Sequence, residues 1–183
     1  MSDYEVFSGR PENAEDRLER ETRCYDFLDG LGIGYKRVDH PAAFTMEACQ
    51  AIDAALGVSI CKNLFLTNRQ HTEYYLLLMP DDKPFKTKQI TSQLGCARFS
   101  FASGEEMEEL LGCSPGSSTI LGLMNDSEKR VRLVVDRDLL GEEFFGCHPC
   151  INTSSLKLKT SDVFGRLREA LGHEMTTVRL SAE

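Results

Sequence analysis

The segment 74–79, with the sequence YYLLLM, restricts the fold of this chain more than any other. Six consecutive apolar or aromatic residues without polar alternation predict a strand that is buried on both faces. Residues 60–67 (ICKNLFLT) predict a second strand, and residues 68–71 predict the turn between the two. Because a strand buried on both faces needs cover from both sides, the sequence predicts a sheet with helices packed around it.

The other elements alternate along the chain. Apolar spacing and capping residues predict helices over residues 14–31, 47–56 (with Thr45 as N-cap), 86–94, 103–111 and 160–171, and strands over 33–38, 98–102 and 130–135. Neither an internal repeat nor a low-complexity linker divides the sequence. Residues 1–183 are therefore predicted to form a single α/β (α+β) domain, a mixed sheet flanked by helices, in which the polar residues 1–13 are a flexible N-terminal segment.

The charge balance restricts the partners. A net charge of −8 over 183 residues argues against a protein that coats nucleic acid through bulk charge. Four cations nevertheless lie within residues 82–98, against Asp82 alone, and they predict either a small phosphate-binding patch or a solvated helix face: Lys83, Lys86, Lys88 and Arg98.

The cysteines and the lengths of the apolar runs indicate the cellular compartment. The seven cysteines are an odd number, and no apolar signal core precedes them, so we expect reduced thiols in the cytoplasm. No apolar run approaches the length of about 18 residues that a membrane span needs, and no membrane partner is expected.

Four polar or glycine-rich segments beside predicted strands are candidate sites: residues 40–42, 62–63, 112–125 and 146–154. Lys62 lies between apolar residues of a strand, so its ammonium either reaches solvent or binds an anion. In the third segment, Gly116 allows close backbone approach, and Ser117 and Ser118 offer donors that can hold an ester carbonyl oxygen. The alternative for this loop is a tight turn without chemistry.

The segment GCHPCINT (residues 146–153) has two interpretations. The C-x-x-C spacing of Cys147 and Cys150 is compatible with a metal site or a redox pair, although no second cysteine pair completes a set of four ligands. Alternatively, His148 binds substrate or transfers a proton, with Asn152 as a nearby amide. We predict neither a metal nor a cofactor.

These segments, taken in order, resemble the YbaK/ProX-type family of prolyl-tRNA editing domains. The resemblance rests on HPAAFT (40–45), KNLFL (62–66), PGSST (115–119) with residues 121–126, and GCHPCINT (146–153). It extends over roughly residues 14–172 and looks closest to the freestanding branch that clears alanyl-tRNA(Pro). The chain departs from the family at residues 120–121, where Ile-Leu stands in place of a frequent Pro-Phe pair.

The resemblance implies a deacylase that hydrolyses mischarged tRNA in trans. Because an aminoacyl ester is activated, we expect attack by a positioned water and no covalent nucleophile. The domain would bind the acceptor end of a mischarged tRNA. The resemblance also suggests prolyl-tRNA synthetase as a partner, and binding of DNA is not expected. The predicted catalytic residues are Lys62, His148 and Gly116. The predicted substrate-binding residues are Asn63, Ser117, Ser118, Thr119, His40, Thr45 and Asn152. The predicted tRNA-binding residues are Lys83, Lys86, Lys88 and Arg98. Two alternatives stay open: a related deacylase for Cys-tRNA(Pro) or another small aminoacyl-tRNA, and a binding module without activity.

Overall fold

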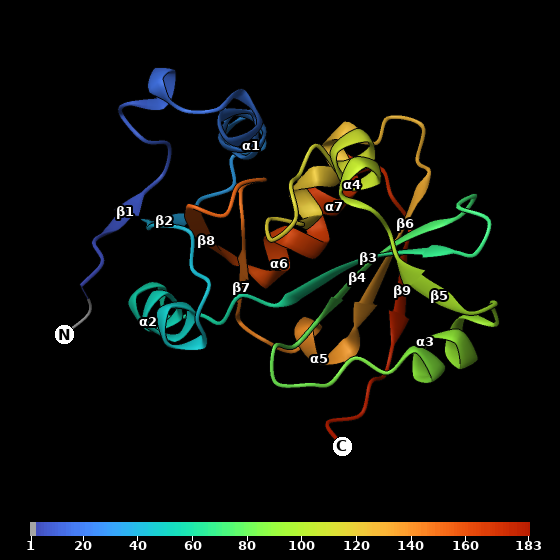
Figure 1. The fold of residues 1–183 in the computed structure, drawn as a ribbon. Helices are drawn as coiled ribbons and strands as arrows, with labels where there is room; N and C mark the ends of the chain where they lie inside the picture. The colour runs from blue at the N-terminus through green and yellow to red at the C-terminus, as the bar shows by residue number, and fades with distance from the viewer. Residues whose placement is uncertain (1–2) are drawn as a thin grey trace.

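The apolar segment that dominates the sequence is the central strand of a five-stranded sheet. The computed structural model describes residues 3–183, and in it this sheet has the order β5-β3-β4-β6-β9 (Figure 1). Its strands are β3 (Lys62–Asn68), β4 (Tyr74–Met79), β5 (Phe99–Phe101), β6 (Val131–Asp136) and β9 (Met175–Val178). All six residues of β4 are buried, so the prediction of a central strand is confirmed.

This sheet is mixed. β3 pairs antiparallel with β4, with Lys62 opposite Met79, and antiparallel with β5. β4 pairs parallel with β6, and β6 pairs parallel with β9. Parallel neighbours require crossover connections, and both of these connections contain helices.

A second sheet lies beside the first (Figure 1). Its order is β1-β2-β8-β7, all antiparallel, with strands β1 (Val6–Ser8), β2 (Lys36–Asp39), β7 (Phe144–Cys147) and β8 (Ser154–Lys159). The predicted mixed sheet is thus two sheets, which the bridge between Ile60 and Gly146 joins. Within the segment 1–13, expected to be flexible, residues 6–8 form an edge strand; residues 1–2 lie outside the described part of the chain.

The longer helices follow their sequence signals, whereas the helices at residues 120–125 and 137–140 were not predicted. They are η1 (Ala14–Asp16), α1 (Glu19–Gly30), α2 (Met46–Leu56), α3 (Thr87–Leu94), α4 (Gly104–Leu111), η2 (Ile120–Asn125), α5 (Arg137–Leu140) and a C-terminal run of α6 (Thr160–Asp162), η3 (Val163–Leu167) and α7 (Arg168–Leu171). Ser103 and Glu106 form a reciprocal cap at the start of α4. Gly57 ends α2 in the left-handed region, at φ 76°.

Two apolar clusters fill the molecule. The larger lies between the two sheets and under α1, α4 and the C-terminal helices, and includes Phe65, Leu76, Leu133 and Phe145. The smaller packs α3 onto the opposite face of the five-stranded sheet, through Ile90 among others. Across residues 3–183, no helix has both the length and the apolar character that a membrane crossing requires.

Candidate functional site

Two histidines from distant parts of the chain meet at one hydroxyl group. His40 follows β2, and its Nε2 lies 2.8 Å from Ser155 Oγ. His148 lies in the turn between β7 and β8, and its Nδ1 lies 3.0 Å from the Ser154 carbonyl oxygen and 3.4 Å from Ser155 Oγ. The two ring centroids are 6.4 Å apart. The antiparallel pairing of β2 with β8 creates this cluster, because it sets the end of β2 beside the start of β8.

The contacts assign the protons of both rings. His148 Nδ1 faces a carbonyl oxygen, so it carries the proton, and its Nε2 keeps a lone pair with no hydrogen-bond donor among residues 3–183. His40 Nδ1 lies 2.9 Å from the Pro41 carbonyl oxygen, so His40 Nε2 accepts from the Ser155 hydroxyl. Burial lowers the pKa of His148 and outweighs the hydrogen bond to Ser154, which raises it; the His40 ring lowers it further. His148 is therefore a neutral imidazole at pH 7 with one nitrogen available to accept a proton.

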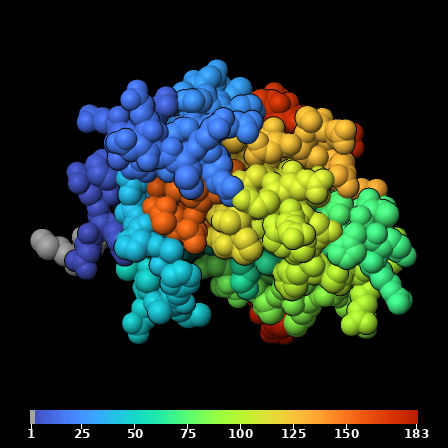
Figure 2. All heavy atoms as spheres, turned by 45° about the horizontal axis from the view of Figure 1, so that its top comes forward, coloured from blue at the N-terminus to red at the C-terminus, as the bar shows by residue number. Residues whose placement is uncertain are grey.

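The glycine-rich loop is tied to the histidine turn. Ser117 is fully buried, and its Oγ lies 2.9 Å from the Ser114 carbonyl oxygen and 3.2 Å from the Cys150 carbonyl oxygen. Gly116 has φ +91°, and a Cβ there would lie 3.9 Å from Asn152 Nδ2. Figure 2 shows this loop (yellow), the histidine turn (orange) and the α2 segment (cyan) on one face, with the surface hollowed between the loop and α2. The structure therefore places the loop with Gly116 and Ser117 against the turn with His148 and Asn152.

Two buried polar atoms of the predicted site have no partner among the described residues: Asn63 Oδ1 and Ser118 Oγ. Asn63 Nδ2 donates to the Cys61 carbonyl oxygen at 2.9 Å, which fixes the amide so that its oxygen remains the free acceptor. An unsatisfied buried polar group costs about 1–3 kcal/mol. A ligand that donates to these oxygens would remove that cost, so both atoms are suited to substrate.

Two predicted substrate-binding threonines have structural contacts. Thr119 is fully buried, and its side chain accepts from Leu121 N at 3.3 Å at the start of η2. Thr45 is exposed, and its Oγ1 accepts from Ala48 N at 3.2 Å as the N-cap of α2. Their contact with substrate stays a prediction.

Lys62 and Asn63 point to opposite faces of β3, because neighbouring residues of a strand alternate. The ammonium of Lys62 donates to the backbone carbonyl oxygen of Lys83. Among residues 3–183, no hydrogen bond joins Lys62 to the histidine turn. The catalytic role predicted for Lys62 therefore requires its long side chain to exchange this carbonyl for substrate.

The predicted tRNA-binding role of Lys83 is wrong. Lys83 is only 7 % exposed, and its ammonium lies 2.7 Å from Asp136 Oδ2, 2.6 Å from Asp138 Oδ2 and 2.8 Å from the Leu180 carbonyl oxygen. Charge composition could not reveal this, because Asp136 lies on a strand 53 residues away in sequence. The other three residues of the predicted patch are exposed, and their role stays a prediction: Lys86, Lys88 and Arg98.

The cysteines of the histidine turn are buried free thiols. Cys150 Sγ lies 3.5 Å from Cys24 Sγ, in the core. Burial raises the pKa of Cys147, and it raises that of Cys61 to about 12. Such thiols are poor nucleophiles at neutral pH. In the described chain, no group of three or more His, Cys, Asp or Glu residues is arranged to hold a metal ion.

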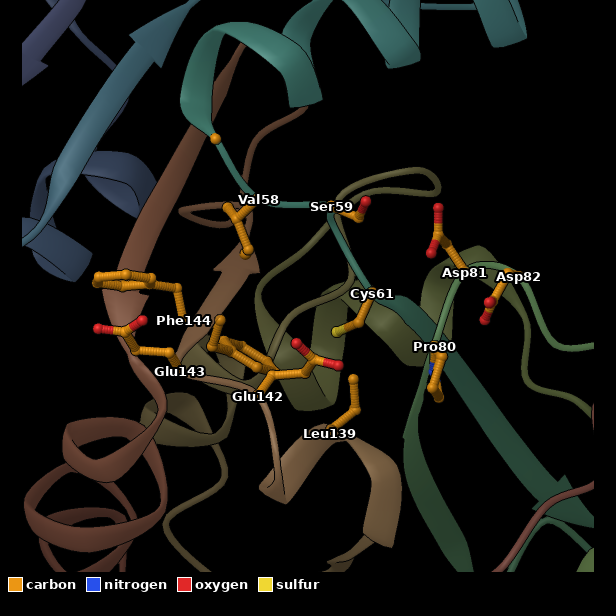
Figure 3. Close-up of a pocket in the computed structure, with 13 residues that line it drawn as sticks. Val58, Ser59, Cys61, Pro80, Asp81, Asp82, Leu139, Glu142, Glu143 and Phe144 are labelled. Atoms are coloured by element: carbon orange, nitrogen blue, oxygen red, sulfur yellow. The ribbon is translucent and has the colours of Figure 1, made fainter.

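A cavity of about 420 Å³ lies next to the site but contains none of the predicted site residues (Figure 3). The end of α2, the start of β3, the end of β4 and the start of β7 enclose it. Four carboxylates line it: Asp81, Asp82, Glu142 and Glu143. These negative charges make it unsuitable for the phosphates of a nucleic acid.

Comparison with known proteins identifies the family. The model of the aminoacyl-tRNA editing domain matches residues 40–165, which contain both histidines and the glycine-rich loop. The chain belongs to the aminoacyl-tRNA editing domain family. The match extends from His40, at the start of the histidine cluster, to Gly165 in η3.

Individual relatives cover most of the chain. The prolyl-tRNA editing protein ProX of Acetoanaerobium sticklandii is 28% identical over 153 residues, covering 84% of this chain and 93% of the relative. The prolyl-tRNA synthetase associated domain-containing protein 1 of Mus musculus is 31% identical over 165 residues, covering 88% and 94%. A solved structure described as a candidate trans-editing enzyme for prolyl tRNA synthetase has a TM-score of 0.67 at 19% identity, covering 90% and 99%, which shows that the fold is shared.

Proposed function

We propose that this protein hydrolyses the ester of mischarged aminoacyl-tRNA in trans, with Ala-tRNA(Pro) as its preferred substrate. The observation that carries the proposal is the neutral His148, whose free Nε2 lies in a turn hydrogen-bonded to the glycine-rich loop. A base and a set of backbone donors held in one rigid unit are what ester hydrolysis by water requires.

In the proposed reaction, His148 Nε2 accepts a hydrogen bond from a water whose oxygen attacks the ester carbonyl carbon. The carbonyl oxygen gains negative charge as the tetrahedral intermediate forms. Ser117 N already donates to the Ser114 carbonyl oxygen at 3.0 Å, which leaves the N–H groups of Gly116 and Ser118 to stabilise that charge. The bond from carbon to the ribose oxygen then breaks, the ribose oxygen takes a proton, and free amino acid and uncharged tRNA leave.

The amino acid would be held by the two unpartnered oxygens. The α-ammonium group of an aminoacyl ester donates up to three hydrogen bonds, and Asn63 Oδ1 and Ser118 Oγ are acceptors without a donor. Lys62 would bind the terminal nucleotide after releasing the Lys83 carbonyl.

Alanine as the preferred amino acid rests on the physics of selection. A proline-binding site cannot strongly exclude the smaller alanine, because one missing methylene changes binding by about 1–3 kcal/mol. A second site too small for proline removes the error by steric exclusion. The relatives whose names refer to prolyl-tRNA editing and prolyl-tRNA synthetase favour the proline tRNA and the synthetase as partners. Mischarged tRNA arises where translation takes place, so we place the protein in the cytoplasm.

A deacylation panel of Ala-, Cys-, Ser- and Pro-tRNA(Pro) tests the proposal. The expected result is fast release of alanine and intact Pro-tRNA(Pro). His148→Gln should lose about 100-fold or more in kcat/KM, the usual contribution of a positioned base. His71→Gln is the matched control, because His71 is an exposed residue of the turn between β3 and β4. Tight binding of tRNA without hydrolysis of any ester would contradict the proposal, and release of cysteine alone would reassign the amino acid.

A further inference from the structure

Three lysines share one face of the four-stranded sheet. Lys36 on β2 lies directly opposite Lys157 on β8, and Lys159 follows two residues later on the same face of β8. Lys36 is also opposite Ser8, and Lys159 is opposite Phe144. We call Lys36, Lys157 and Lys159 the lysine face.

No carboxylate neutralises the lysine face. Within residues 3–183, none of its three ammonium groups forms an ion pair. Lys36 Nζ donates to Ser8 Oγ at 2.6 Å, and Lys157 Nζ lies 4.2 Å from the centroid of the Phe144 ring. Like charges directly opposite each other destabilise a sheet. In a protein with a net charge of −8, an unneutralised cation cluster of this kind is suited to an anionic partner.

The C-terminal end of α2 offsets part of this repulsion. Lys157 Nζ lies 3.2 Å from the position that a Cβ on Gly57 would occupy. The partial negative charge of a helix C-terminus stabilises a nearby cation. This contact stabilises Lys157 alone, whereas Lys36 and Lys159 are exposed to solvent.

The lysine face borders a cavity of about 710 Å³. A fourth cation, Arg166, also lines it, together with the acids Asp29 and Asp162. Arg166 Nη2 lies 2.8 Å from Asp162 Oδ1, so these two charges neutralise each other. The remaining lining charges are three lysines against Asp29, which leaves the cavity positive.

The lysine face lies on the same strand as the histidine cluster. Ser155, which contacts both histidines, points to the same side of β8 as Lys157 and Lys159. At about 3.3 Å per residue, the Cα of Lys159 is about 13 Å from that of Ser155. The exposed Lys86 and Lys88 lie instead at α3, which packs on the other sheet (Figure 1).

We propose that the lysine face binds the sugar-phosphate backbone of the tRNA whose aminoacyl end occupies the histidine cluster. The inference rests on the proposed function for the identity of the nucleic acid. Three ammonium groups neutralise about three phosphates, a number that suits a protein with an otherwise acidic surface. Such contacts position the RNA without reading its sequence.

Binding of uncharged tRNA(Pro) against salt tests the lysine face directly. The Lys36→Gln/Lys157→Gln/Lys159→Gln variant should show a slope of log K against log salt that is shallower by about 2, and affinity lower by about tenfold or more near 0.1 M salt. Lys86→Gln/Lys88→Gln measures the α3 cations separately, and its slope should change less than that of the lysine-face variant. Because long surface side chains are replaced by glutamine, far-UV circular dichroism should be unchanged in both variants.

A second arm uses a truncated substrate, the alanyl ester of adenosine. The lysine-face variant should raise KM for Ala-tRNA(Pro) and leave hydrolysis of the adenosine ester at the wild-type rate. An unchanged salt slope in this variant, with a shallower slope in the α3 variant, would overturn the inference. So would saturable binding of inorganic phosphate to the lysine face with no loss of tRNA affinity in the variant. A wild-type protein that binds tRNA through these lysines but hydrolyses no ester would refute the proposed function and leave the lysine face standing.

Discussion

Replacing Lys83 by methionine tests whether the Lys83 ammonium stabilises the fold or binds tRNA. The change removes an ammonium that contacts Asp136, Asp138 and the Leu180 carbonyl oxygen, and leaves a carboxylate at Asp136 that is 0 % exposed. Breaking a buried ion pair costs about 3–5 kcal/mol. Because water can reach the Asp138 side of this contact, we expect Lys83→Met to lower the free energy of unfolding by about 3 kcal/mol, the lower end of that range. In urea unfolding, this loss should appear as a lower midpoint with an unchanged m-value.

The neighbouring carboxylate supplies the control. The Asp138 side chain is 62% exposed, so Asp138→Asn should change the free energy of unfolding far less than Lys83→Met. At a temperature where both variants are folded, the salt dependence of their tRNA binding should match that of the wild type. A stability loss below about 1 kcal/mol, combined with a shallower salt slope for Lys83→Met, would refute the structural assignment.

Three other predictions concern the reaction. Because burial lowers the pKa of His148, kcat/KM should decrease with falling pH only below pH 6.5, the ordinary pKa of an imidazole. A decrease that already begins above pH 7 would contradict the assignment of His148 as the base. Lys62→Ala should lose most deacylation while its circular dichroism is unchanged, and wild-type turnover would remove Lys62 from the mechanism. Cys147→Ser and Cys150→Ser should keep most activity in the same assay, since buried thiols are not needed for attack by water; a stoichiometric metal lost together with activity would point to a metal site instead.

Local sequence signals predicted the helices and the long strands well. The Thr45 and Ser103 caps and the Gly57 stop lie where the pattern put them, because these contacts involve residues a few positions apart. The strands β1, β7, β8 and β9 were not predicted. β1, β7 and β9 have only three or four residues, and β8 pairs with β2 far along the chain, so their own residues carry little signal.

The candidate site was predicted as segments and not as an arrangement. Glycine-rich and His-Pro motifs pointed to Gly116 and His148, but the hydroxyl of Ser155 that joins His148 to His40 was missed. That contact exists only because β2 pairs with β8, more than 100 residues apart. The same limit applies to Lys83, whose charge is balanced by residues that no local pattern connects to it.

The pairing of β9 has a consequence for biosynthesis. β9 forms the edge of the five-stranded sheet beside β6, and Leu180 just beyond it accepts from the buried ammonium of Lys83. Every other strand of that sheet emerges from the ribosome before β9 does. Until residues 175–180 have been synthesised, β6 has an open edge and Lys83 lacks one of its partners. During translation the nascent chain therefore exposes the unpaired edge of β6. Unpaired strand edges bind chaperones and promote aggregation.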